Sequence, residues 1–92
     1  MMYELIPENN RKSFYGKARV LVKEDVKYLI SYNSLILSLD KNNKIHRHFG
    51  EPISNTTCSH IKSFIKSELG IDYNKKKFLK LPYEKKEMQI CM

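Results

Sequence analysis

Apolar and polar residues alternate along the first half of the chain, a pattern typical of strands with one buried face. Between residues 13 and 23, the even-numbered positions are small or apolar and the odd-numbered positions are mostly polar or basic. The alternation predicts four strands, at residues 13–23, 26–32, 35–39 and, most weakly, 45–49. Short segments rich in turn-forming residues separate them, at 24–25, 33–34 and 40–44.

The phase of this alternation assigns a buried face to each strand. We expect Val20 of the first strand, Ile30 of the second and Leu37 of the third to point into the core. Lys27 and Leu29 then belong to the opposite face, together with the odd-numbered residues of the first strand. That opposite face is predicted to be basic, aromatic and partly apolar.

After residue 52 the apolar spacing changes to three and four positions, which is the period of an amphipathic helix. Ser54 or Asn55 is placed to cap the N-terminus of this helix, and Gly70 is placed to end it. The apolar stripe predicted for the helix consists of Cys58, Ile61, Phe64, Ile65 and Leu69.

The order of these elements predicts an α+β fold, a four-stranded antiparallel meander followed by one amphipathic helix packed on one face. The pattern also allows a short second helix, which would start at Asp72 or Asn74 and end before Pro82. A length of 92 residues predicts a single domain, residues 1–92. We expect residues 1–12 and 84–92 to be loosely ordered ends.

Charge is the main functional signal of the composition. Seventeen basic residues against ten acidic ones give +7, which favours an acidic partner, either a protein or ribonucleoprotein complex or nucleic acid. Fourteen of the seventeen are lysines, which contact phosphates as point charges, so we expect low sequence specificity. Simple solvation of the surface is the alternative, and Leu21 and Leu29 leave a homodimer open as well. The candidate partner-binding residues are Tyr15, Lys17, Arg19, Lys23, Lys27, Arg47, Lys62 and Lys66.

The residue pattern does not indicate catalysis, a metal site or a cofactor. Cys58 and His60 are two positions apart on the predicted helix, about 200° around its axis, so they cannot hydrogen-bond each other. Zinc needs four converging ligands, and Cys58 with His46, His48 and His60 lacks the paired spacing of a zinc motif. Thr56 and Thr57 at the helix N-terminus suit a cap or a bound phosphate. We therefore expect a protein that is not an enzyme and takes no cofactor.

The location of the protein is predicted from what the chain lacks. The sequence has no apolar run of about 18 residues, the length of a membrane span. The first residues do not follow the pattern of a signal peptide. Cys58 and Cys91 lie far apart in the sequence, so reduced thiols are expected. These features predict a cytoplasmic protein without a membrane partner.

Three stretches of the sequence form a recognisable set. They read Ser13-Phe14-Tyr15-Gly16-Lys17-Ala18, then Ser31-Tyr32-Asn33-Ser34, then Thr56-Thr57-Cys58-Ser59-His60-Ile61-Lys62-Ser63-Phe64. In this order the chain resembles a family of small uncharacterised proteins carried by phages, prophages and gut bacteria. Ser59 and Ser34 stand where members of that family more often carry a basic residue and a threonine.

The resemblance implies a mobile-element setting, in which small proteins bind nucleic acid or block a host defence complex. Combined with the charge, it predicts a non-enzymatic binding protein that docks a basic sheet face on a nucleic-acid-handling complex of the bacterial host. An inhibitor of the anti-CRISPR type is one form of this function. The alternative is a plain DNA- or RNA-binding accessory protein of low sequence specificity.

Overall fold

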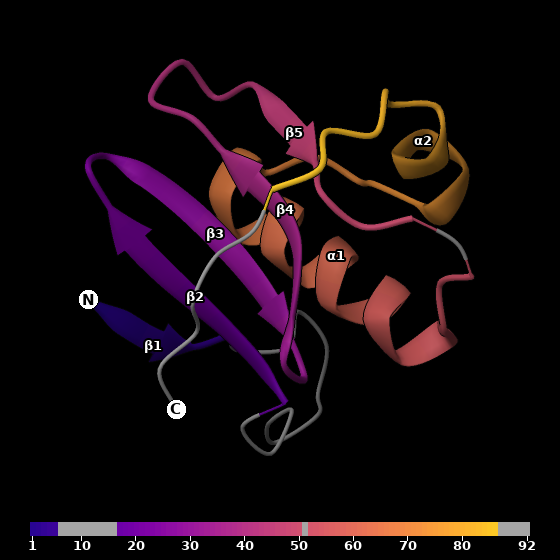
Figure 1. Cartoon of the computed structure of the whole chain (residues 1–92), viewed down its shortest axis with the longest axis horizontal. Coiled ribbons are helices and arrows are strands. Elements are labelled where there is room, and N and C mark those ends of the chain that lie inside the picture. The colour runs from indigo at the N-terminus through magenta and orange to yellow at the C-terminus, as the bar shows by residue number, and fades with distance from the viewer. Residues whose placement is uncertain (6–16, 51, 87–92) are drawn as a thin grey trace.

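The computed structural model describes residues 1–5, 17–50 and 52–86, and within them it contains one five-stranded sheet and two helices (Figure 1). The strands are β1 (Met2–Glu4), β2 (Ala18–Lys23), β3 (Val26–Ser31), β4 (Ser34–Leu39) and β5 (Ile45–Arg47). The helices are α1 (Asn55–Leu69) and α2 (Lys75–Leu79). The sheet order β1-β2-β3-β4-β5 is antiparallel throughout. The α+β meander and the second helix are confirmed.

The prediction of four strands was wrong, because β1 adds a fifth. Met2 pairs with Leu21 and Glu4 with Arg19, so β1 covers the edge of β2 that the meander leaves open. A strand of three residues is too short to show an alternating pattern, and its pairing depends on an edge far along the chain. Residues 6–12 and 87–92 of the predicted loose ends lie outside the described residues.

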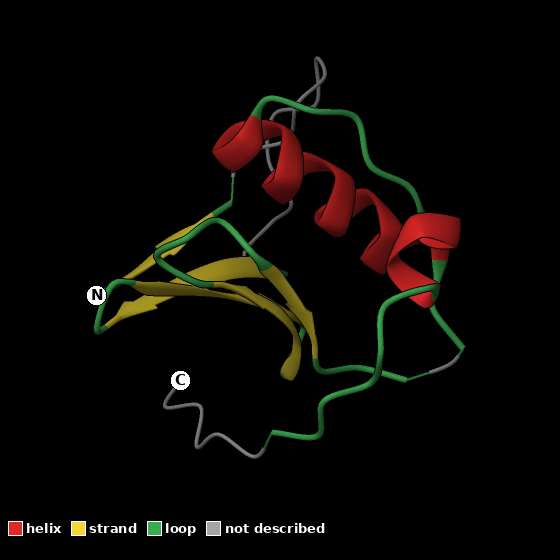
Figure 2. Cartoon of the chain, turned by 90° about the horizontal axis from the view of Figure 1, so that it is seen from above, coloured by secondary structure: helices red, strands yellow, loops and turns green. Residues whose placement is uncertain are grey.

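Helix α1 lies across one face of the sheet (Figure 2). Ser54 caps it, since the Ser54 hydroxyl accepts a hydrogen bond from the backbone N–H of Thr57. Gly70 ends it with φ 69°, and the Gly70 N–H donates to the carbonyl of Lys66. Both caps agree with the prediction. The core between helix and sheet includes Val20, Leu29, Leu37, Ile61, Phe64, Ile65 and Phe78.

The predicted face of β3 was wrong. A two-residue turn at Glu24-Asp25 pairs Lys23 with Val26, which places Val20 opposite Leu29. Cross-strand partners share a face, so Leu29 and Lys27 point toward α1, while Tyr28 and Ile30 point away from it. A β-bulge after Leu29 then pairs Leu29 with Leu37 and Ile30 with Leu35.

We call the sheet surface opposite α1 the helix-free face. By register it carries Arg19, Leu21, Lys23, Val26, Tyr28, Ile30, Leu35, Ser38 and His46. Tyr28, Ile30 and Leu35 are buried although neither of the two described helices covers this face. Neither of the helices in the described ranges combines the length and hydropathy that a bilayer crossing needs.

Candidate binding site

The described parts of the three resemblance stretches, residues 17–18, 31–34 and 56–64, meet at one corner of the sheet, where β2 begins and the β3–β4 turn lies. The Tyr32 N–H donates to the carbonyl of Lys17 at 2.6 Å. The Arg19 guanidinium donates to the carbonyl of Tyr32 at 2.6 Å and contacts the Asn33 side-chain oxygen at 3.4 Å. The Lys17 ammonium lies 5.9 Å from the centre of the Tyr32 ring. We call Lys17, Arg19 and Tyr32 the basic corner.

A chain of hydroxyl groups, buried except at Ser54 and called below the buried hydroxyl chain, connects this corner to the start of α1. The Ser54 hydroxyl donates to Thr57 Oγ1 at 3.1 Å, and Thr57 Oγ1 lies 3.1 Å from Ser31 Oγ. Ser31 Oγ in turn lies 2.8 Å from Nδ1 of His60, whose side chain is fully buried. Ser31 directly precedes Tyr32, so the polar chain fixes the base of the β3–β4 turn on the helix.

Tyr32 is presented in an unusual backbone conformation. Its φ is 57°, in the left-handed region that bulky residues seldom occupy, yet its side chain is 45% exposed. The turn therefore occupies Tyr32-Asn33, one position earlier than predicted. The ring of His60 lies 6.0 Å from the Tyr32 ring. The surrounding hydrogen bonds keep Tyr32 in this unfavourable backbone conformation and thereby hold its ring at the surface.

The exposed edge of the basic corner is positively charged because of Lys17. Lys17 is exposed, and in the part of the chain that the structure describes it has no carboxylate partner. Glu4 stands opposite Arg19 in the β1–β2 pairing and offsets part of the charge of β2. An exposed ring with a mobile ammonium beside it suits a nucleobase with its phosphate, or an acidic segment of a protein.

The structure brings only some of the predicted contact residues together. Lys17 and Arg19 meet at Tyr32, whereas Lys23 is exposed at the far end of β2. Tyr15 lies outside the described residues. Lys62 and Lys66 are exposed on α1, on the other layer of the molecule.

Lys27 and Arg47, two more of the predicted contact residues, make their contacts within the fold. Lys27 lies on the α1 side of the sheet and forms an ion pair with Glu68 of that helix. The hydrogen bond to Glu68 raises the pKa of Lys27. Arg47 is buried, and its guanidinium donates to the carbonyls of Phe49, Leu79 and Leu81 at 2.8, 3.2 and 3.1 Å. Arg47 thereby attaches the end of α2 to β5.

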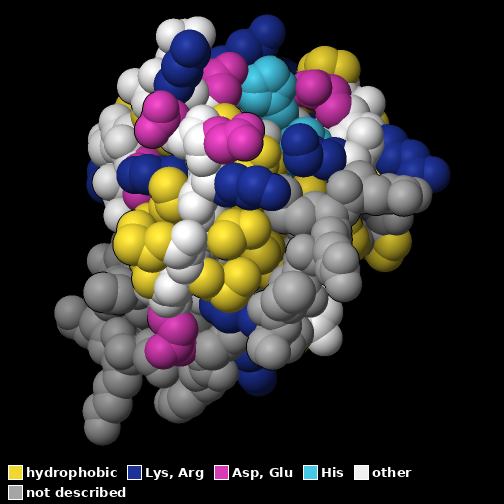
Figure 3. Space-filling view, turned by 60° about the vertical axis from the view of Figure 1, so that its left-hand side comes forward, with side chains coloured by type: hydrophobic (Ala, Val, Ile, Leu, Met, Phe, Trp, Pro, Cys, Tyr) yellow, Lys and Arg dark blue, Asp and Glu magenta, His cyan; other side chains and the backbone are white. Residues whose placement is uncertain are grey.

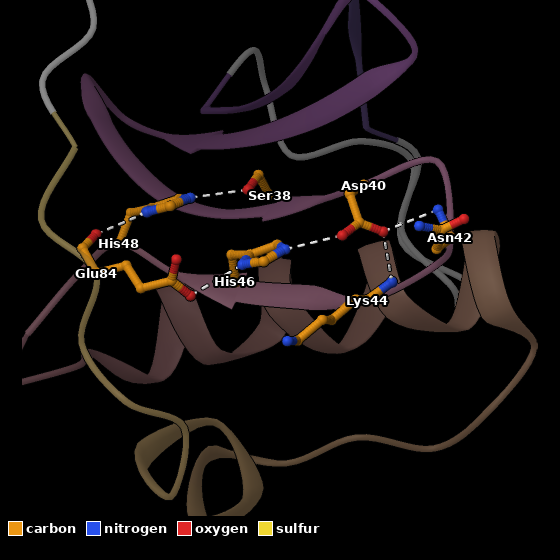
Figure 4. Close-up of polar contacts among 7 residues, drawn as sticks. All are labelled: Ser38, Asp40, Asn42, Lys44, His46, His48 and Glu84. Atoms are coloured by element: carbon orange, nitrogen blue, oxygen red, sulfur yellow. Dashed lines mark hydrogen bonds and ion pairs between the residues drawn. The ribbon is translucent and has the colours of Figure 1, made fainter.

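A second polar cluster lies at β5 (Figure 4). His46 has Asp40 Oδ2 at 2.9 Å from Nε2 and Glu84 Oε2 at 2.9 Å from Nδ1. The hydrogen bond to Asp40, and next the one to Glu84, raises the pKa of His46. The same bond to His46, with the Lys44 amide, lowers the pKa of Asp40. Among the described residues, no group of His, Cys, Asp or Glu has the arrangement of a metal site.

Sequence reasoning missed Tyr32 as a surface aromatic, because it treated the residue as the last buried position of a strand. The position of Tyr32 inside one of the three resemblance stretches was the available signal. His60 was weighed as a ligand or base, and the structure instead shows it buried against Ser31.

Residues 1–80 match the sequence model of the Family of unknown function (DUF8033). The chain belongs to this family. The match extends from β1 to the end of α2, so the DUF8033 region contains the basic corner and the buried hydroxyl chain. Glu84 lies beyond the matched DUF8033 residues. The chain matches no curated protein and no solved structure.

Proposed function

We propose that this DUF8033 protein is a small non-enzymatic binding protein that docks through the basic corner on a nucleic-acid-handling complex. The observation that carries the proposal is the exposed Tyr32 ring, held at φ 57° beside Lys17 and Arg19. A side chain fixed in advance loses little conformational freedom on binding, which is how aromatic anchors contribute to interfaces. The buried hydroxyl chain holds Ser31, directly before Tyr32, against α1 and so helps to fix the turn that carries the ring.

The nature of the partner follows from charge and from the resemblance. A net charge of +7 attracts acidic surfaces and speeds encounter with them. The resemblance to phage and prophage proteins supports a role in a mobile element within the host cytoplasm. Occluding a surface of a host defence complex, as an anti-CRISPR inhibitor does, is the form of the function that we propose.

The same corner also supports a second function, that of a DNA- or RNA-binding accessory protein. An aromatic face next to a lysine is the arrangement that stacks an unpaired base and neutralises its phosphate. The face of the molecule in Figure 3 argues against a uniformly basic footprint, because acidic and basic side chains are interspersed there around an apolar patch. The basic corner, and not the whole sheet face, is therefore the surface to test.

Matched charge variants test the proposal. Lys17→Ala/Arg19→Ala/Lys23→Ala removes three charges from β2 and the corner, and Lys75→Ala/Lys76→Ala/Lys77→Ala removes three charges from α2. Each variant and the wild type serve as bait for host lysate, with and without nuclease, and each is titrated with a short fluorescent oligothymidine. We expect the β2 variant alone to lose a partner that withstands nuclease, and wild-type binding to weaken with salt.

Tyr32 variants separate an anchor from a charge effect. Tyr32→Phe keeps the ring and should keep the partner, whereas Tyr32→Leu should lose it while circular dichroism shows an intact fold. Equal losses of binding from the two triple variants would mean that only net charge matters, and would refute the hypothesis that the basic corner is the binding site. A partner lost on nuclease treatment, with Tyr32-dependent binding of the oligothymidine, would establish the accessory function instead.

A further inference from the structure

The chain after α2 returns along the sheet on the side opposite α1 (Figure 2). We call residues Tyr83–Lys86 the strap. Tyr83 forms a parallel bridge with Arg47, and the Glu84 N–H donates to the Arg47 carbonyl at 2.8 Å. The Lys86 ammonium lies 5.3 Å from the ring centre of Tyr28, which belongs to the helix-free face. The strap thus crosses from the edge of β5 onto that face.

His46 joins the strap to the β4–β5 turn through both of its ring nitrogens. Nε2 faces the Asp40 carboxylate and Nδ1 faces the Glu84 carboxylate, each at 2.9 Å. An ionised carboxylate only accepts hydrogen bonds, so both ring nitrogens must carry a proton. Both hydrogen bonds of His46 can form at once only when its ring is a cation. Figure 4 shows the ring lying between the two acidic side chains.

The two carboxylates are not held equally. Asp40 Oδ1 accepts hydrogen bonds from the backbone amides of Asn42 at 2.8 Å and Lys44 at 3.0 Å, so the turn fixes this carboxylate. The Glu84 side chain is 46% exposed, against 27% for Asp40. When His46 loses a proton to solvent, the remaining N–H is better retained toward the fixed Asp40. Nδ1 then presents a lone pair to Glu84.

His48 holds the strap in a way that does not need a charged ring. Its Nδ1–H donates to the Glu84 carbonyl oxygen at 2.7 Å, and its Nε2 accepts from the Ser38 hydroxyl at 2.8 Å. The His46 and His48 rings stack with centres 6.5 Å apart. Among the described residues, the charged or titratable groups facing His46 are Asp40 from the turn, Glu84 from the strap and His48 just after β5, and Lys86 and Tyr28 line the same pocket.

We infer that His46 is a proton-operated clamp on the strap, closed when the ring is charged and open toward Glu84 when the ring is neutral. Opening releases the Glu84 side chain, which lines an open pocket of about 220 Å³ together with Tyr28, Ser38, His48 and Lys86. Because the two carboxylates raise the pKa of His46 above its ordinary value of about 6.5, the clamp is complete below that ordinary value. It is lost as the pH rises through the raised pKa.

Hydrogen exchange followed by NMR tests the clamp on the full chain. The readouts are the titration of the His46 ring and the protection of the Glu84 amide, corrected for the intrinsic pH dependence of exchange. We expect protection of Glu84 to fall about tenfold as the pH passes through the His46 transition. The Gly70 amide, at the end of α1, serves as an internal control that should not change.

Two variants make the result decisive. Glu84→Gln should lower the pKa of His46, and His46→Gln should leave Glu84 protection independent of pH while far-UV circular dichroism stays unchanged. A Glu84 amide whose protection does not follow the His46 titration in the wild type would overturn the clamp. So would the same pH dependence in the wild type and in His46→Gln.

Discussion

Phe64 provides the most direct test of how α1 sits on the sheet. Its ring is fully buried in the core that also contains Val20, Leu29 and Leu37. Phe64→Ala removes a phenyl ring, whose transfer to water alone is worth about 2–3 kcal/mol. The cavity left behind adds to this, since a core closed by helix and sheet together collapses only in part, and the expected total is about 3–5 kcal/mol.

This loss is large for a protein of 92 residues. Typical stabilities per residue imply a free energy of unfolding of about 5–14 kcal/mol for the whole chain. The melting temperature should fall by at least about 12 °C, given about 4–8 °C per kcal/mol at this size. Urea unfolding monitored by far-UV circular dichroism gives the free energy directly, provided that the m-value is unchanged.

Ile71 is a matched control, because its side chain is 48% exposed beyond the end of α1. Ile71→Ala should cost less than about 1 kcal/mol. A loss for Phe64→Ala as small as that of Ile71→Ala would show that the ring does not lie between helix and sheet. The rotation of α1 about its axis, and with it the position of the buried hydroxyl chain, would then be incorrect.

Two further predictions concern backbone strain and the attachment of α2. Glu24 and Asp25 have φ of 53° and 63°, so Glu24→Asn/Asp25→Gly should stabilise the fold by about 1 kcal/mol in urea melts, and a loss of stability would contradict this turn geometry. Arg47→Met leaves the carbonyls of Phe49, Leu79 and Leu81 without their donor and should cost about 2–3 kcal/mol by the same measurement. A variant as stable as the wild type that loses its partner would instead place Arg47 at an interface.

The elements whose causes are local could be predicted from the sequence. Ser54 and Gly70 flank α1 as expected, because a cap satisfies backbone groups that lie within about four positions of it, at the end of the helix. Asn74 likewise starts α2, and its side chain accepts a hydrogen bond from the Lys77 amide. The alternation over β2 was sufficient to predict a strand, since the period of two is a property of the strand alone.

The face of β3 required the pairing between strands. The pattern of residues in β3 supports either phase, because Tyr28 and Ile30 on one face and Leu29 on the other are all large side chains that a core can bury. The turn at Glu24-Asp25 decides between them by pairing Lys23 with Val26. Lys27 consequently faces α1 and pairs with Glu68, and does not extend the basic face predicted for it.

The candidate sites depended on tertiary structure even more. Ser31 and His60 are separated by 29 positions, and His46 and Glu84 by 38, so no local spacing relates them. Charge and composition led to the hypothesis of an acidic partner, and the three resemblance stretches indicated which residues belong together. Only the packing of α1 on β3 brought the described residues of those stretches to one corner. Hydrogen bonds and burial act through space, whereas an alternating pattern shows only which side of its own strand a residue occupies.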